Sequence, residues 1–264
     1  MIGTVRLRFA EPLRLFLPAR LRAAGMVDVD HEPGTPLRHV VPAAGVPLTE
    51  VGILRADGES VGADHRPRPG AVVDVADVVR PQPVAAWRFI LDVHLGALAR
   101  RMRLLGLDVA WSADAEDDAL AARAVDETRV LLTQDHGLLR RRVLAPDEDR
   151  RARAAHVRGS AATEQIRDVL DRFAPPLAPF TRCTACGGAL VPTSKDSVAH
   201  LLEPGTLRTY DEFVRCLGCG RPYWHGAHAA RLVAMVRSDV DAAPGGRDHR
   251  RGPSTPLLGP SALA

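Results

Sequence analysis

Two closely spaced pairs of cysteines constrain the fold of this chain more than any other feature of its sequence. Two residues separate Cys183 from Cys186, and two separate Cys216 from Cys219. Glycine follows each pair and permits the tight turn that brings backbone N–H groups toward sulfur. Four thiolates complete a tetrahedral site, which is the arrangement of structural rather than catalytic zinc. We therefore predict that all four cysteines bind one structural Zn²⁺ ion.

Disulfides and free buried thiols are the alternatives to zinc. The first residues show no basic segment followed by an apolar one, so we expect no secretory signal and a cytoplasmic location. Cytoplasmic thiols stay reduced, which argues against disulfides. No stretch approaches about 18 uninterrupted apolar residues, so we expect no association with a membrane.

The length of 264 residues suffices for roughly two or three small domains, and a net charge of +3 neither requires nor excludes a nucleic-acid partner. The local placement of basic residues says more. Arg100 and Arg101 share one predicted helix, Arg140 follows an acidic segment, and His94 stands at a helix start. We expect these four side chains to contact nucleic-acid phosphates, with solvated helix faces as the alternative.

Residues 1–81 form the first predicted unit, and the order of their elements is that of an α+β β-grasp domain. Apolar residues alternate over 4–9 and again over 13–17, so we expect two strands joined as an antiparallel hairpin. A further extended piece is expected at 27–31, a short helix from Leu37, and later strands at 46–54 and 72–79. The Pro81-Gln82-Pro83 segment then predicts a linker.

Residues 87–177 alternate strands with helices, which indicates an α/β domain built on a parallel sheet. The strands are expected at 88–91, 108–111, 129–133 and 155–157. The helices are expected at 95–105, 119–125 and 163–173, with a helical turn at 136–142.

Acidic residues follow the ends of these predicted strands. Asp92 and Asp135 each come just beyond a C-terminal strand end, and Asp117 and Asp118 follow the intervening strand. Ligands of open parallel sheets bind at these ends, so carboxylates from three places in the sequence can converge there. Carboxylate oxygens suit Mg²⁺ or Mn²⁺, which can activate water and stabilise a phosphoryl group. Capping of the following helices is the alternative for each aspartate.

Five blocks of the chain resemble one nuclease family. Residues 89–96 (FILDVHLG) are similar to the opening of a PIN-like nuclease domain, specifically that of the mutator-seven C-terminal RNase-domain family. Residues 113–120 (ADAEDDAL), 130–135 (VLLTQD) and 179–183 (PFTRC) match later blocks of that family. Residues 45–51 (GVPLTEV) resemble a block of the ubiquitin-like domain that its bacterial members often carry. The blocks stand in the family's order.

The resemblance implies a protein of three parts. These are a ubiquitin-like β-grasp domain over 1–81, a PIN-like nuclease domain over 87–177 and a zinc ribbon over 178–237. The remaining residues, 238–264, are rich in Pro, Gly and Ser and lack a periodic apolar pattern, so we expect a disordered tail.

The family also implies a metal-dependent ribonuclease, with acids at the positions of Asp92, Asp135 and either Asp117 or Asp118. Neighbouring residues of a helix point about 100° apart, so we expect only one of the latter two to face the site. PIN domains commonly use a fourth acid near a later strand, and Glu164 is the nearest candidate here.

We therefore predict hydrolysis of RNA phosphodiester bonds at an Mg²⁺ or Mn²⁺ site that includes Asp92 and Asp135. The alternative is an RNA- or ribosome-binding adaptor with an inactive nuclease-like core, which the missing fourth acid favours. The first unit continues into Arg80 instead of ending in the free Gly-Gly of ubiquitin-like carriers, so we expect it to bind or position a protein partner.

Aromatic and histidine residues follow the second cysteine pair. Tyr223 and Trp224 either stack on unpaired bases or pack the small core of the ribbon, and packing is the expected role. His225 and His228 have a spacing that a second metal could use, but an ordinary surface role is expected because four cysteines are already present.

Overall fold

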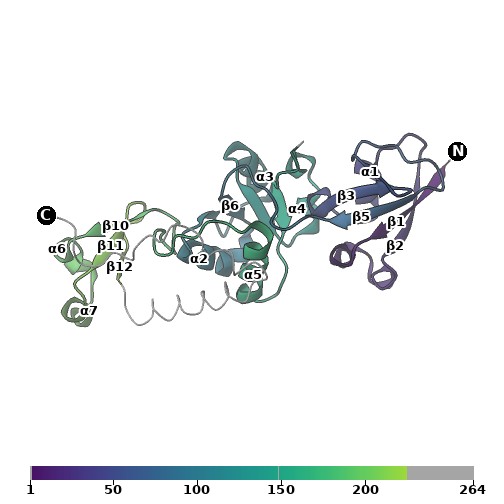
Figure 1. Ribbon diagram of the computed structural model, residues 1–264. Helices are drawn as coiled ribbons and strands as arrows, with labels where there is room; N and C mark the ends of the chain where they lie inside the picture. Colours follow the sequence, from purple (N-terminus) through teal and green to yellow (C-terminus); the bar gives the residue numbers. More distant parts are fainter. Residues whose placement is uncertain (1, 148, 225–264) are drawn as a thin grey trace.

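A computed structural model describes residues 2–147 and 149–224. It contains three units that follow one another along the molecule (Figure 1). A mixed sheet stands at one end, a parallel α/β sheet lies in the middle, and a small antiparallel sheet with the four cysteines stands at the other end. The predicted fold class is therefore confirmed. None of the described helices is long and apolar enough to cross a lipid bilayer.

The N-terminal unit is a five-stranded sheet of order β2-β1-β5-β3-β4. Strands β1 and β5 pair in parallel, and the other neighbours pair antiparallel. The strands are β1 (Gly3–Phe9), β2 (Met26–His31), β3 (Val51–Ala56), β4 (Glu59–Val61) and β5 (Val72–Asp77), with helix α1 (Leu37–Ala43) and the 3-10 helices η1 (Glu11–Phe16), η2 (Ala19–Leu21) and η3 (Leu48–Glu50) between them.

The expected second strand at 13–17 is wrong, because this segment lies almost wholly in the 3-10 helix η1. Pro12 at its first turn fixes a helical φ, and Leu13 and Phe16 are buried three residues apart, which is the repeat of a 3-10 helix. The true partner of β1 is β2, the predicted extended piece. The strand expected from Val46 begins only at Val51, after η3.

The middle unit is a four-stranded, all-parallel sheet of order β7-β6-β8-β9. Its strands are β6 (Arg88–Leu91), β7 (Asp108–Trp111), β8 (Val130–Thr133) and β9 (Ala154–His156). Helices α2 (Gly96–Leu104) and α5 (Ala162–Phe173) cover one face, while α3 (Asp117–Asp126) and α4 (His136–Leu139) contribute to the core on the other. Successive residues of β6 alternate between these two cores, as a pleated strand requires.

The first two units share one buried core, so the N-terminal unit is packed onto the middle one. Glu50 accepts a hydrogen bond from the backbone N–H of His156 on edge strand β9, at 2.9 Å. The same carboxylate pairs with Arg172 at 2.6 Å, and the two side chains are only 2% and 1% exposed. Buried Gln82 accepts from Arg172, so the expected linker is instead packed into this interface. The open edge of the parallel sheet is thereby covered.

The C-terminal unit is an antiparallel sheet of order β10-β11-β12, formed by β10 (Leu190–Thr193), β11 (Phe213–Cys216) and β12 (Pro222–Trp224). Short helices α6 (Lys195–Val198), η6 (Ala199–Leu201) and α7 (Pro204–Thr209) lie in the long connection between the cysteine pairs. His225, His228, the end of the expected ribbon and the expected tail lie outside the described residues.

Candidate active site and cysteine centre

Asp92 and Asp135 lie where the connections of the parallel sheet diverge. From β6 the chain runs through α2 to β7 on one side, and from β8 it runs through α4 and η5 (Arg142–Leu144) to β9 on the other. Strands β6 and β8 are neighbours, so a crevice is expected beyond their C-terminal ends. Asp92 directly follows β6, and Asp135 stands two residues after β8.

The hydroxyl of Thr133 links the two aspartates. Thr133 is fully buried at the end of β8 and donates to Oδ2 of Asp92 at 2.6 Å. Its oxygen accepts from the backbone N–H of Asp135 at 2.9 Å. Sequence reasoning missed this residue, although a hydroxyl that closes an apolar strand two positions before an aspartate is a usable signal.

Asp92 is a buried carboxylate, with 6% of its surface exposed. Among the residues described, no cationic side chain forms an ion pair with it, and Thr133 is its side-chain partner. A buried negative charge is costly without a nearby cation. One of its oxygens is used by Thr133, and a carboxylate keeps further acceptor capacity. The donor set thus fits a hard divalent cation.

Asp135 also caps a helix, which was the alternative role predicted for each aspartate. Its Oδ1 accepts from the backbone N–H groups of Gly137 at 2.5 Å and Leu138 at 3.0 Å, at the start of α4. These bonds fix the direction of the Asp135 carboxylate. Capping and metal binding are compatible because the second oxygen is not used by the cap.

Asp117 and Asp118 form the first turn of α3, and both are exposed at their side chains. Arg141 forms ion pairs with both of them, a close one with Asp118 and one of 3.8 Å with Asp117. The hydrogen bond to Asp118, followed by the charges of Asp118, Asp117 and Asp135, raises the pKa of Arg141. One guanidinium therefore pairs with both exposed acids at the start of α3.

The acids surround the strand ends without forming a compact cluster. In the described parts of the chain, only the four cysteines place three or more potential ligand atoms within 4.8 Å of one another. Glu164, the suggested fourth acid, accepts from the backbone N–H groups of Ser160 at 2.8 Å and Ala161 at 3.1 Å. These backbone bonds lower its pKa and hold the start of α5.

The predicted phosphate-contacting residues lie in different surroundings. His94 is exposed in the short 3-10 helix η4 (Val93–Leu95), directly after Asp92. Arg100 and Arg101 lie on α2, where Arg100 donates to the carbonyl of Gly96 at 3.4 Å. Arg140 turns instead toward the N-terminal unit and donates to the carbonyl of Pro42 at 3.2 Å.

The four cysteines converge as the sequence predicts and form no disulfide. The Sγ atoms of Cys183 and Cys219 lie 3.7 Å apart, and those of Cys186 and Cys216 lie 3.4 Å apart. Tetrahedral zinc with Zn–S bonds of about 2.3 Å places its sulfurs about 3.8 Å apart. The cluster is therefore consistent with a structural zinc ion.

Hydrogen bonds prepare one of these thiols for a metal. Burial disfavours the thiolate of Cys183, but the Tyr223 hydroxyl at 3.0 Å and nearby backbone N–H groups outweigh burial and lower its pKa to about 6. Trp224 packs against Phe213 and Tyr210, with ring centroids 6.3 and 6.2 Å away. Tyr223 and Trp224 thus both make contacts within the ribbon, Tyr223 with a cysteine and Trp224 with neighbouring aromatic rings.

The ribbon contacts the middle unit on the side away from the acids. Buried Arg103 of α2 donates to the carbonyls of Val109 at 3.1 Å and Ala185 at 2.7 Å, and Ala185 lies between the first two cysteines. Arg182 pairs with Asp108, the first residue of β7, at 3.6 Å. The cysteine centre therefore lies near the N-terminal ends of the strands, whereas Asp92 follows a C-terminal end.

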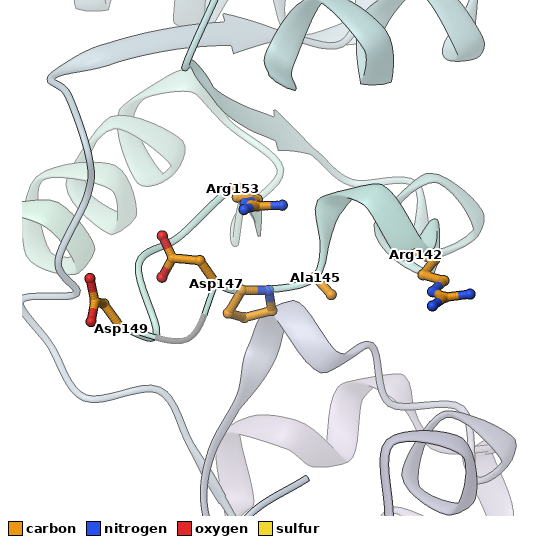
Figure 2. A pocket seen from close by; sticks show the side chains of 6 residues that line it. Arg142, Ala145, Asp147, Asp149 and Arg153 are labelled. Carbon is orange, nitrogen blue, oxygen red and sulfur yellow. The ribbon is translucent and has the colours of Figure 1, made fainter. Parts of the chain in front are cut away.

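An open pocket of about 510 Å³ lies in the connection from η5 to β9 and is separate from these sites. It is lined by Arg142, Ala145, Pro146, Asp147, Asp149 and Arg153. Figure 2 shows the two carboxylates on one side of Arg153 and Arg142 on the other. This mixture of charges selects no single class of ligand.

Comparison with known proteins places this geometry in a family. Residues 87–236 match the model of the Mut7-C RNAse domain, and residues 2–83 match that of the Mut7-C ubiquitin domain. The chain belongs to the Mut7-C RNase family, because the first match covers more than half of it. The expected resemblance is confirmed. Membership in an RNase family implies a nuclease with a nucleic-acid substrate.

A human protein named "Exonuclease mut-7 homolog" is 25% identical over 280 residues. The alignment covers 68% of this chain and 31% of the human protein, so the chain spans about a third of that relative's length. No solved structure matches the chain.

Proposed function

We propose that this protein is a metal-dependent ribonuclease whose active site is the C-terminal edge of β6 and β8. The observation that carries the proposal is the buried Asp92 carboxylate, which Thr133 holds and links to the backbone of Asp135, at the divergence point of an RNase-family sheet. Asp92, Asp135 and one of Asp117 or Asp118 would hold Mg²⁺ or Mn²⁺. When bound, such an ion supplies an activated water and stabilises charge on the scissile phosphate.

The residues of the chain have separate tasks in this proposal. Thr133 fixes the rotamer of Asp92, and the N-terminus of α4 fixes that of Asp135. Preorganised carboxylates avoid the cost of rearrangement when the metal and the substrate bind. Exposed His94 follows Asp92 by two residues, and in this proposal it contacts an RNA phosphate. Four thiolates would hold a structural Zn²⁺ at the other edge of the sheet, away from the reaction.

The second candidate is a nucleic-acid-binding adaptor without catalysis. Two observations favour it: the described carboxylates do not gather within metal-binding distance, and Glu164 is used at the start of α5. Asp92 argues against it, because this buried carboxylate has no cationic partner among the described residues, which is costly in a protein that has no use for it.

Cleavage of end-labelled single-stranded RNA and DNA by the full chain tests the proposal. The assay uses Mn²⁺, Mg²⁺ or EDTA with zinc-loaded protein. Cleavage of RNA that needs the divalent ion is expected. Folded protein that binds RNA but cleaves neither nucleic acid with either metal would favour the adaptor.

A further inference from the structure

Arg141 pairs with the two neighbouring acids, Asp117 and Asp118, of which the proposed function assigns one to the metal. It lies between α4 and η5, and its guanidinium contacts Asp118 and Asp117 at the start of α3. The charge of Asp135 also acts on it. A guanidinium at this place offsets the mutual repulsion of the two adjacent carboxylates at the start of α3.

The neighbouring arginines do not share this position. Arg140 donates to the carbonyl of Pro42, and Arg142 lines the pocket that contains Asp147. Three consecutive arginines therefore point to three different surroundings. In the described structure, Arg141 is the one of the three that contacts Asp117 and Asp118. The sequence alone cannot distinguish them.

The ion pair between Arg141 and Asp118 is exposed to solvent. The Asp118 side chain is 91% exposed, and that of Arg141 is 34% exposed. Ion pairs in such surroundings contribute little net stability, because water screens both charges. A divalent ion carries twice the charge and coordinates carboxylate oxygens directly, so it can displace the guanidinium.

We infer that Arg141 is the internal counter-ion of Asp117 and Asp118, that a divalent metal bound by the acids displaces it, and that the released guanidinium then contacts a phosphate of the RNA. This inference rests on the proposed function. A guanidinium suits the second role because its planar fork binds phosphate oxygens with two parallel hydrogen bonds. The metal-free and metal-bound states would thus use one side chain for two purposes.

Metal binding gives a test that does not depend on cleavage. Mn²⁺ affinity is measured by electron paramagnetic resonance of the free ion, for the full chain, Arg141→Gln and the matched control Arg142→Gln. Arg141→Gln should bind Mn²⁺ several-fold more tightly, because the competing cation is gone, and Arg142→Gln should bind like the parent. Unchanged or weaker Mn²⁺ binding by Arg141→Gln would overturn the inference.

Binding of phosphorothioate RNA, whose backbone resists hydrolysis, tests the second role. Arg141→Gln should lose RNA affinity in Mn²⁺ but not in EDTA, where Arg141 is held by the aspartates. Loss of one phosphate contact should also lower the salt dependence of binding in Mn²⁺ by about one ion. Arg141→Lys, which keeps the charge without the fork, should be intermediate. Equal losses in Mn²⁺ and EDTA would contradict release of Arg141 by the metal.

The two proposals fail in different ways. Asp92-dependent cleavage, together with Arg141→Gln that matches Arg142→Gln in Mn²⁺ affinity, would overturn this inference and leave the nuclease proposal intact. Folded parent protein that binds no Mn²⁺ would overturn both.

Discussion

Thr133 carries the most specific geometry of the candidate site. A single hydroxyl holds Asp92 and receives the backbone N–H of Asp135, so the directions of both acids depend on it. Groups that orient metal ligands commonly affect metal affinity or activity by roughly 10- to 100-fold. The residue is small, buried and distant from solvent, which makes its contribution separable from substrate contact.

Replacing Thr133 with Val removes both hydrogen bonds at nearly constant volume. We expect cleavage to fall about 10- to 100-fold and the free energy of unfolding to fall by about 1–3 kcal/mol, because the N–H of Asp135 loses its partner. Thr133→Ser keeps the hydroxyl and should retain most activity. Single-turnover cleavage and urea denaturation measure the two effects, and full activity in Thr133→Val would remove this role.

His156 gives the fold a dependence on pH. Burial lowers its pKa to about 4, and the positive charge of His136 and Arg158 acts in the same direction, while Glu50 and Asp168 oppose the shift. Protonation therefore favours the unfolded chain, where the pKa of histidine is about 6.5. The stability conferred by neutral His156 is complete above about pH 6.5 and is lost as the pH falls toward 4.

The free energy of unfolding should thus fall by at most about 3 kcal/mol between pH 6.5 and 4 through this group. His156→Gln keeps the backbone N–H bond to Glu50 and removes the titration. The difference between parent and variant, measured by urea denaturation across this range, isolates the effect from that of the carboxylates. A pH-independent difference would contradict the assignment.

At the scale of elements, the β9 edge is held by one buried ion pair. Glu50 belongs to η3 of the first unit and Arg172 to α5 of the second, and Gln82 also binds Arg172. Removing one partner of a buried pair leaves the other charge uncompensated and costs about 3–5 kcal/mol. The covering of β9 therefore depends on two side chains 122 residues apart.

Glu50→Gln should lower the free energy of unfolding by about 3–5 kcal/mol and expose the 80–83 segment to protease. Glu50→Gln combined with Arg172→Met removes both charges and should recover part of this loss. Urea denaturation and limited proteolysis measure the outcomes. A single variant as stable as the parent would show that this ion pair does not hold the two units together.

The cysteine centre organises the loop that Arg103 binds. The carbonyls of Thr184 and Ala185 both accept from this guanidinium. Loss of zinc should disorder the loop and detach the ribbon, while the α/β sheet keeps its own core.

The parent should contain one zinc ion per chain by elemental analysis, and Cys183→Ser should contain much less. Chelation should change the near-ultraviolet signal of Trp224 and increase protease sensitivity around 178–224, with the far-ultraviolet signal of the sheet largely retained. Absence of zinc from protein purified without chelator would contradict a zinc site.

The sequence predicts elements well where local pattern and tertiary role agree. The runs 88–91 and 130–133 are strands at or close to the expected residues, because a central parallel strand covered on both faces is almost continuously apolar. The 13–17 segment fails because its apolar residues fit two repeats: Leu13, Leu15 and Leu17 alternate, whereas Leu13 and Phe16 lie three residues apart, as in a 3-10 helix. Pro12, whose fixed φ suits the first turn of a helix, was the local signal that this segment is helical.

The site is predictable only in part for a different reason. Strand ends can be read from the sequence, so Asp92 and Asp135 are found. The partner of a long side chain depends on packing between distant segments, which periodicity does not encode. The contacts of Arg141 and the Glu50–Arg172 pair therefore become visible only in three dimensions.

At the scale of the whole molecule, the two flanking units stand in different relations to the acids. The N-terminal unit packs close to Asp135. The ring centroids of Phe16 and of His136, the residue directly after Asp135, lie 4.8 Å apart. The ribbon joins the other ends of the strands through Arg182 and Asp108. Figure 1 shows this elongated order, with the α/β unit in the middle. The first unit is thus the one placed to influence the proposed reaction.

The most direct test of the central claim compares Asp92→Asn with Asp126→Asn, an exposed aspartate at the end of α3, in Mn²⁺-dependent cleavage of single-stranded RNA. If the edge of β6 and β8 is the active site, Asp92→Asn abolishes cleavage while the fold and zinc content persist, and Asp126→Asn cleaves like the parent. Cleavage by Asp92→Asn at the parental rate would contradict the account and move the search for the active site away from this edge.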